Sequence, residues 1–157
     1  RCANVSLPKI RAKALNLCKR LNLIKLSSAI SANKALSLDV FFSAKTHKPE
    51  CPLRVIVSEN QAWQKSLSLY LKQQLDKLLI NDPFKVRNSE DVVSFLARNE
   101  IKQMNAFSVD IKDLYYSIPQ NALLTTVADC IDSYGVVAFQ NAAGIAVGSF
   151  LELLSTY

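Results

Sequence analysis

The sequence predicts an α+β fold, in which helices and a few strands follow one another without regular β-α-β alternation. Half of the 157 residues are hydrophobic, so the chain is able to bury a core and is not a disordered tail. Apolar residues recur at helical spacing over much of the chain, whereas residues 38–44, 53–58 and 105–111 have the composition of strands. We divide the chain into a basic helical segment, residues 1–35, and a domain or part of a domain, residues 36–157.

A basic helix and a β-hairpin are the first expected elements. The helix covers residues 9–26, where apolar side chains recur with Lys and Arg between them. Those apolar residues are Ile10, Ala14, Leu17, Leu21 and Ile24. The strands 38–44 and 53–58 follow, and the turn between them contains Pro49 and Pro52, which exclude a helix there. The two strands are therefore expected to pair as a hairpin.

Two helices are expected in the middle of the chain. A stripe of leucines predicts a long helix over residues 61–80, which Asn81-Asp82-Pro83 ends. Ser89 is expected to be the N-cap of a second helix, which runs to about Asn99. Two acidic residues directly after Ser89 favour the positive end of that helix.

The last part of the chain is expected to begin with the strand 105–111. Pro119 is a favourable first residue for a helix that runs to about Ser133. A glycine-containing loop, residues 142–149, then leads to a final helix, residues 150–157.

The net charge, the apolar runs and the cysteines indicate which partners and which compartment suit the protein. Lys and Arg outnumber Asp and Glu by 19 to 13, and a formal net charge of +6 attracts phosphate polymers. No apolar run is long enough to cross a bilayer, and charges throughout the first segment argue against a signal peptide. The scattered cysteines favour a reducing compartment. Because the sequence starts with Arg1 and ends at Tyr157 inside a leucine-rich pattern, we expect it to be a piece of a longer protein.

Asp110 and Asp113 are the first candidates for chemistry. Asp110 ends an expected apolar strand, where a carboxylate needs a partner such as a divalent metal ion. Asp113 lies in the following turn, whose backbone N–H groups are able to receive phosphate oxygens, and Tyr115 places an aromatic ring near the same point. The alternative is that both carboxylates cap local turns, since a short Asp-x-x-Asp pattern is common.

Lys45, Lys48 and Arg54 gather around the expected hairpin turn, with His47 between the two lysines. Cations on a hairpin are able to clamp a triphosphate, and Arg donates two parallel hydrogen bonds. The alternative for this stretch is a solvated, positively charged turn. We interpret His47 as an ordinary surface residue.

Gly144 and Gly148 are two of the three glycines in the chain. Glycine allows the backbone to approach a ligand closely. The alternative is a plain loop that enters a helix with Ser149 as its N-cap. The spacing matches neither the P-loop nor the dinucleotide-binding fingerprint.

Taken together and in this order, these stretches resemble reverse transcriptases, and most of all those of Penelope-like retroelements. In that family a Lys-Thr-His-Lys-Pro turn leads into Pro-Leu-Arg-x-Ile-Val-Ser, as in Lys45 to Ser58. A leucine-rich helix and a helix start of the form Ser-x-Asp-Val follow, as in Ser89 to Val92.

The resemblance continues into the family's first catalytic block. There a strand ends in Asp, with an aromatic residue five positions later and then Ile-Pro, as in Asp110, Tyr115 and Ile118-Pro119. The glycine loop comes last, as in Gly144 to Ser149, and the resemblance covers residues 36–157. It implies an incomplete right-hand polymerase, with the fingers and the first half of the palm.

The resemblance also implies an activity, which is RNA-directed DNA synthesis by two-metal nucleotidyl transfer in a retrotransposable element. Asp110 would be the catalytic ligand of two Mg²⁺ ions, and the carbonyl of Ile111 a further metal ligand. Tyr115 would lie under the incoming sugar and reject a 2′-hydroxyl group. The remaining nucleotide-binding residues would be Lys45, Lys48, Arg54, Asp113, Leu114, Gly144, Gly148 and Ser149.

Departures from the family pattern limit this expectation. Gly148-Ser149 continues with Phe150 where the family commonly has proline, and no Asp-Asp pair occurs in the sequence. We therefore expect this part to be inactive alone. The expected partners are an RNA template, a DNA primer and deoxynucleoside triphosphates, in the nucleus or cytoplasm and without a membrane. A non-catalytic nucleic-acid-binding remnant and a transposon pseudogene product remain the alternatives.

Overall fold

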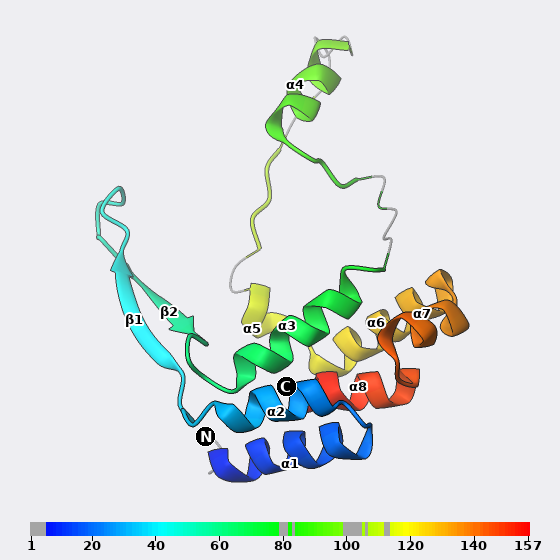
Figure 1. The fold of residues 1–157 in the computed structure, drawn as a ribbon. Helices are drawn as coiled ribbons and strands as arrows, with labels where there is room; N and C mark the ends of the chain where they lie inside the picture. The colour runs from blue at the N-terminus through cyan, green and yellow to red at the C-terminus, as the bar shows by residue number, and fades with distance from the viewer. Residues whose placement is uncertain (1–5, 79–81, 83, 99–104, 106, 112–113) are drawn as a thin grey trace.

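A body of helices carries two projections in the computed structural model of the chain, a β-hairpin and a helical arm (Figure 1). The structure describes residues 6–78, 82, 84–98, 105, 107–111 and 114–157. Within this part of the chain the predicted α+β class is confirmed, because helices surround a core and a single two-stranded antiparallel sheet accompanies them.

The helix predicted over residues 9–26 is instead two helices, α1 (Leu7–Arg20) and α2 (Ile24–Ala32). The break lies at Asn22, whose φ of 56° is left-handed and cannot continue a helix. Leu23 N–H then donates to Cys18 O over 2.9 Å, which satisfies a carbonyl at the end of α1. The break folds α2 back beside α1, so both helices turn apolar side chains to one core.

Arg11 joins these two helices at the end of α2. Its guanidinium Nη2 donates to the carbonyl oxygens of Ile30, Ser31 and Asn33, at 3.0, 3.0 and 2.7 Å. The last carbonyls of a helix lack partners within it, and a cation is favoured at that end by the helix dipole. One α1 side chain therefore caps α2 and fixes its position.

The long helix predicted over residues 61–80 is shorter, as α3 (Gln64–Leu75). Gln61 has a φ of 66°, and Ala62 forms an isolated parallel bridge with Ala35, so neither residue is helical. Trp63 is buried just before α3 starts, and Leu67 and Leu71 continue the buried stripe. Residues 79–81 lie outside the described part of the chain.

Three further helices complete the body, namely α6 (Gln120–Tyr134), α7 (Val136–Ala143) and α8 (Val147–Thr156). The helix from Pro119 is confirmed, with Pro119 as its N-cap, whereas α7 was not predicted. Gly135 (φ 108°) lies at the corner between α6 and α7. The rings of Phe139 and Phe150 meet edge to face in the core with centroids 5.0 Å apart.

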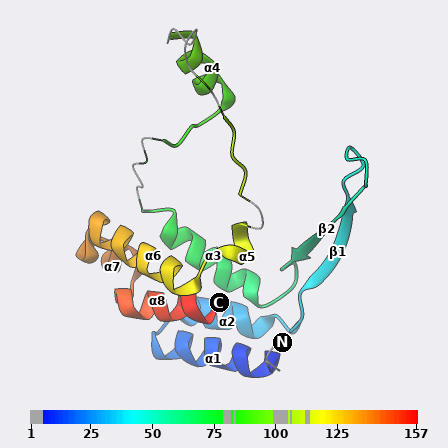
Figure 2. The ribbon, with the colours of Figure 1, turned by 180° about the vertical axis from the view of Figure 1, so that it is seen from behind.

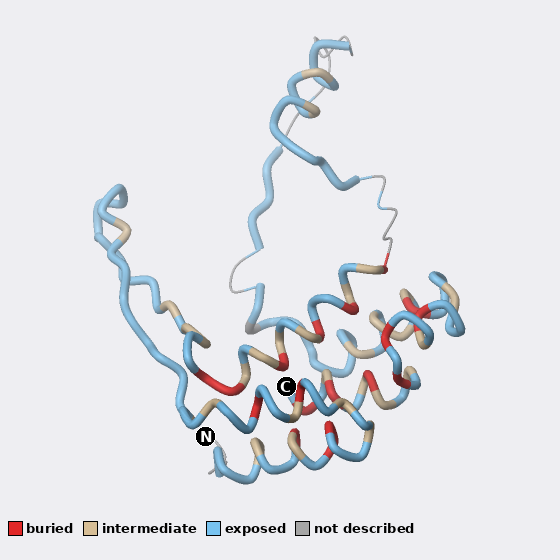
Figure 3. The backbone as a smooth tube through the Cα atoms, in the orientation of Figure 1, coloured by how far each residue is buried: buried red, intermediate tan, exposed pale blue. Residues whose placement is uncertain are grey.

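The core draws on both ends of the sequence. Figure 3 shows buried positions concentrated in the helices of the body and in the turn before α3. The largest fully buried side chains are Trp63, Phe139, Phe150, Ile30, Leu67, Ile131, Leu153 and Cys18. Helix α8 packs against both α1 and α6, so the last helix occupies a central place.

The predicted hairpin is confirmed as β1 (Asp39–Ala44) and β2 (Leu53–Ser58), paired antiparallel. It projects from the body in both Figure 1 and Figure 2, and most of its residues are exposed. Val40 pairs with Val57, and Phe42 pairs with Val55, so one face of the hairpin is apolar.

The second projection carries α4 (Ser89–Arg98), where a helix was predicted. Its N-cap is Asn88 rather than Ser89, because Asn88 Oδ1 accepts from Asp91 N–H at 3.0 Å. Arg87 Nε also donates to Asp91 Oδ2 at 3.1 Å. No α4 residue is buried, and Val93 and Phe95 are each 63% exposed.

The strand predicted over residues 105–111 is wrong at the described positions, Asn105 and Phe107–Ile111, which form neither helix nor strand. A strand needs a neighbour to receive its backbone hydrogen bonds, and the two described strands pair with each other. The short helix α5 (Leu114–Ser117) follows.

No single described helix combines the length and the apolar character needed to cross a membrane. Helices α6 and α7 taken as a pair have the required length and apolar composition, but the chain bends by 103° between them.

Replacing Arg11 with Met should lower the free energy of unfolding by about 1–3 kcal/mol, because it removes the donor that satisfies the carbonyls ending α2. Urea denaturation followed by circular dichroism measures this. Lys19→Met, at an exposed position of α1 with no hydrogen bond to α2, is the control and should change stability by less than about 0.5 kcal/mol. Equal losses in the two variants would mean that Arg11 does not cap α2.

The environment of Tyr157 should make the folded chain less stable at alkaline pH. Burial and a hydrogen bond donated to the Glu59 carboxylate raise the pKa of Tyr157 to about 12, from a usual value near 10. The folded chain therefore favours the neutral phenol, so the contribution is complete below pH 10 and is lost as the pH rises towards 12. Thermal unfolding measured across this interval should show a smaller loss in Tyr157→Phe than in the unaltered chain. Parallel curves would contradict the coupling.

Candidate functional site

Main-chain hydrogen bonds shape the tip of the hairpin. Lys45 N–H donates to Pro52 O at 3.0 Å, which extends the strand pairing by one step. Lys48 N–H donates to Lys45 O at 3.0 Å, and Cys51 N–H donates to Lys48 O at 2.9 Å. Two successive tight turns therefore close the tip without using any side chain, which leaves its cations available.

The predicted cations of this tip are brought together. Arg54 lies in β2 opposite Ser43, directly beside the turn that carries Lys45 and Lys48. For Lys45, Lys48 and Arg54, the described residues provide no side-chain hydrogen bond or ion pair. Because side chains alternate along a strand, Arg54 lies on the face opposite Val55. Glu50 lies in the same turn, so the tip carries three of these cations and one carboxylate at the end of a projecting arm.

Asp110 lies in the segment that descends from α4 towards α5 (Figure 1). Its flanking apolar side chains are open to solvent, with Val109 75% and Ile111 62% exposed. In α5, Leu114 is 40% exposed and Tyr115 is 90% exposed. Asp113 lies outside the described residues.

The glycine segment differs from the loop that the sequence predicts. Gly144 ends α7 with a left-handed φ of 72°, and its N–H donates to Gln140 O at 2.8 Å. Gly148 and Ser149 belong to the first turn of α8, whose N-cap is Ala146. Ser149 as the N-cap is therefore wrong. The helix starts earlier because Gln140 Oε1 accepts from Val147 N–H at 3.2 Å, which satisfies a free donor there.

The three stretches do not meet in this structure. In Figures 1 and 2 the hairpin and the turn between α7 and α8 lie towards opposite sides of the molecule, and the segment of Asp110 runs between them. Among the described residues, no group of three or more His, Cys, Asp and Glu side chains is placed to hold a metal ion. The described part of the chain therefore does not fit a complete two-metal site by itself.

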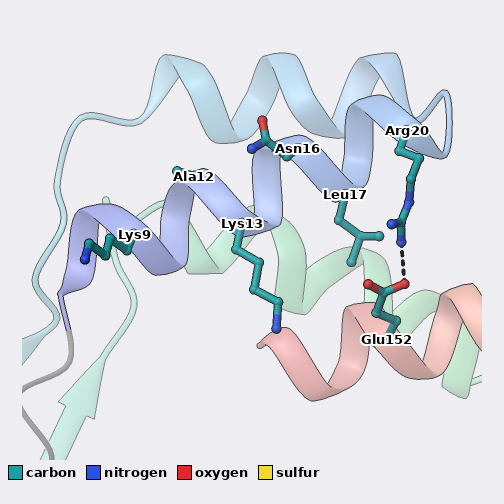
Figure 4. Close-up of a pocket in the computed structure, with 7 residues that line it drawn as sticks. All are labelled: Lys9, Ala12, Lys13, Asn16, Leu17, Arg20 and Glu152. Carbon is teal, nitrogen blue, oxygen red and sulfur yellow. Dashed lines mark hydrogen bonds and ion pairs between the residues drawn. The ribbon is translucent and has the colours of Figure 1, made fainter.

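A groove between α1 and α8 was missed by the sequence analysis. Cationic residues of α1 face Glu152 of α8 across a cavity of about 460 Å³. The periodicity of the basic residues is visible in the sequence, but the approach of α8 is not. Arg20 Nη2 and Glu152 Oε2 form an ion pair of 2.5 Å there (Figure 4).

Comparison of the chain with protein-family models, curated proteins and solved structures gives no match.

Proposed function

We propose that this chain is the fingers and the first half of the palm of a reverse transcriptase from a retrotransposable element, most like those of Penelope-like elements. The observation that carries the proposal is the order of the motifs, from the Lys-Thr-His-Lys-Pro turn through the apolar segment ending in Asp110 to Gly144. Each motif is common alone, whereas their order and spacing over residues 36–157 are specific.

The geometry of the hairpin supports the part assigned to the fingers. Lys45, Lys48 and Arg54 project from a narrow arm and have no described partners, so a triphosphate would not have to displace an existing ion pair. Arg54 would donate two parallel hydrogen bonds to phosphate oxygens, and the lysines would add point charges. The tip would therefore position the leaving phosphates relative to the palm.

The exposed residues around Asp110 support the part assigned to the palm. Phe107 and Val109 leave 90% and 75% of their surface in contact with solvent, an arrangement that costs hydrophobic free energy. In a complete enzyme, further strands would pair with this segment and cover these side chains. Asp110 would then end a buried strand, and Tyr115 would lie beside the sugar of the nucleotide.

Two Mg²⁺ ions are part of this proposal, although the described residues alone do not form their site. Such ions neutralise charge on the transferring phosphate when they are bound. From this chain, Asp110 would supply one carboxylate and Ile111 a carbonyl oxygen. The other carboxylates would come from an aromatic-x-Asp-Asp strand in a later part of the enzyme.

A second candidate is a nucleic-acid-binding protein without catalysis. It is favoured by the same distribution of groups, since cations are exposed on the hairpin and on α1 while no described carboxylates gather at Asp110. Metal-dependent synthesis separates the two candidates, because both would bind nucleic acid in a salt-dependent manner.

Asp110→Asn should abolish deoxynucleotide incorporation on an RNA template with a DNA primer, because the amide removes the charge that holds the metal ions. The assay uses a polypeptide that continues past Tyr157 in the same frame, and a gel-shift measurement should show template binding unchanged. Asp129→Asn, at an exposed position of α6, is the matched control and should retain full synthesis. Synthesis by Asp110→Asn at the control rate, or the absence of synthesis from the unaltered polypeptide, would remove the polymerase assignment.

Tyr115→Ala should admit ribonucleotides more readily, because the ring no longer blocks a 2′-hydroxyl group. The measurement is the ratio of kcat/KM for a deoxynucleotide to that for the matching ribonucleotide in the same continuing polypeptide. We expect this ratio to fall by at least about tenfold, equivalent to about 1.4 kcal/mol of discrimination. Tyr134→Ala, in α6, is the control, and an unchanged ratio in Tyr115→Ala would remove that residue from the site.

A further inference from the structure

A row of polar and cationic side chains lines one wall of the groove between α1 and α8. Lys9, Lys13, Asn16 and Arg20 are spaced at i, i+4, i+7 and i+11, which places them on one face of a helix. Figure 4 shows them along α1, with α8 beside the part from Lys13 to Arg20 and Glu152 next to Arg20. The floor of the groove contains the buried side chain of Leu17.

The spacing of this row suits a linear polyanion. At 1.5 Å of rise per residue, Lys9 and Lys13 are separated by about 6 Å along the axis, comparable to successive phosphates on an extended single strand. From Lys9 to Arg20 the row extends over about 16 Å. A free phosphate ion would contact only part of such a row, whereas a strand would follow it.

The charges in the groove are unbalanced. Three cationic groups face one carboxylate, and that carboxylate is paired with Arg20. Lys9 and Lys13 have no ion pair or side-chain hydrogen bond within the described residues. Lys9 also lies in the first turn of α1, where no acidic residue is present and the helix dipole disfavours a cation. Lys9 therefore adds nothing to the stability of α1 through the helix dipole, and its charge is available to an anionic ligand.

We propose that the α1–α8 groove binds the phosphate backbone of a single-stranded nucleic acid. Lys9 and Lys13 contact successive phosphates, Asn16 donates a hydrogen bond between them, and Arg20 contributes less because Glu152 neutralises it. The site is separate from the hairpin tip and from Asp110, and it needs neither metal ions nor nucleotides. It therefore stands whether or not the chain belongs to a polymerase.

The first test measures how the binding of a fluorescein-labelled oligouridylate depends on salt, by anisotropy and with the 157-residue chain. Loss of one phosphate contact should reduce the slope of log K against log[salt] by about 0.7 for a single strand. We expect this reduction in Lys9→Gln and in Lys13→Gln. Lys25→Gln, at an exposed position of α2 outside the groove, is the matched control and should keep the slope.

The second test uses the carboxylate of the groove. Glu152→Gln frees Arg20 and should tighten oligouridylate binding by about three- to tenfold. Asp76→Asn is the matched control, since it frees Lys72 from an exposed ion pair on α3 and should leave the affinity within about twofold. Circular dichroism checks that both variants keep their helices.

Two results would overturn the proposal. One is that the groove variants behave as their controls do, which would make the row an ordinary solvated face. The other is that the groove variants lose binding to vesicles of phosphatidylserine while oligouridylate binding is unchanged, which would assign the row to a lipid surface. Neither result depends on DNA synthesis, so the polymerase proposal is judged separately.

Discussion

The packing of α8 against α1 is the contact on which the rest of the structure depends. It places Phe150 and Leu153, from one end of the sequence, in the same core as Ala14 and Cys18 from the other. Helices α2 and α3 add to one side of this pair, and α6 and α7 add to the other. Helix α4 has no buried residue and lies outside this core, whereas Leu78, just after α3, still belongs to it. The same contact creates the basic groove, because α8 provides its second wall.

Elements that depend on local signals are predictable from this sequence, and those that depend on distant partners are not. The hairpin is correct because its proline-containing turn and β-branched strands specify pairing between neighbours. Residues 107–111 have the same apolar composition but have no described strand beside them, so composition alone misleads. The break at Asn22 was missed because the apolar period continues through it, and only the backbone conformation reveals it. Helix α7 was missed because it starts with two β-branched residues of low helix propensity and has no side chain that caps it.

The residues of the candidate site also differ in how well the sequence predicts their positions. Sequence order locates Lys45, Lys48 and Arg54 on one turn, and the hairpin brings them together as a local structure must. It does not reveal that Gly148 belongs to a helix, because the bond from Val147 to Gln140 depends on how α7 and α8 meet. Nor does it reveal the α1–α8 groove, whose ion pair joins residues 132 positions apart. Contacts between residues distant in the sequence are therefore the features that residue types alone did not predict.

The separation of 132 residues between Arg20 and Glu152 also bears on the route by which the chain reaches its native state. Loop closure becomes entropically more costly with length, and contacts distant in sequence slow folding. During synthesis α1 and α2 leave the ribosome long before α8, which supplies one of the contacts of α1. Helices α2 and α3 are able to pack together before α8 is made, whereas the face of α1 that contacts α8 stays exposed until then. Closure of this core therefore has to wait until α8 is synthesised and packs against α1 and α6.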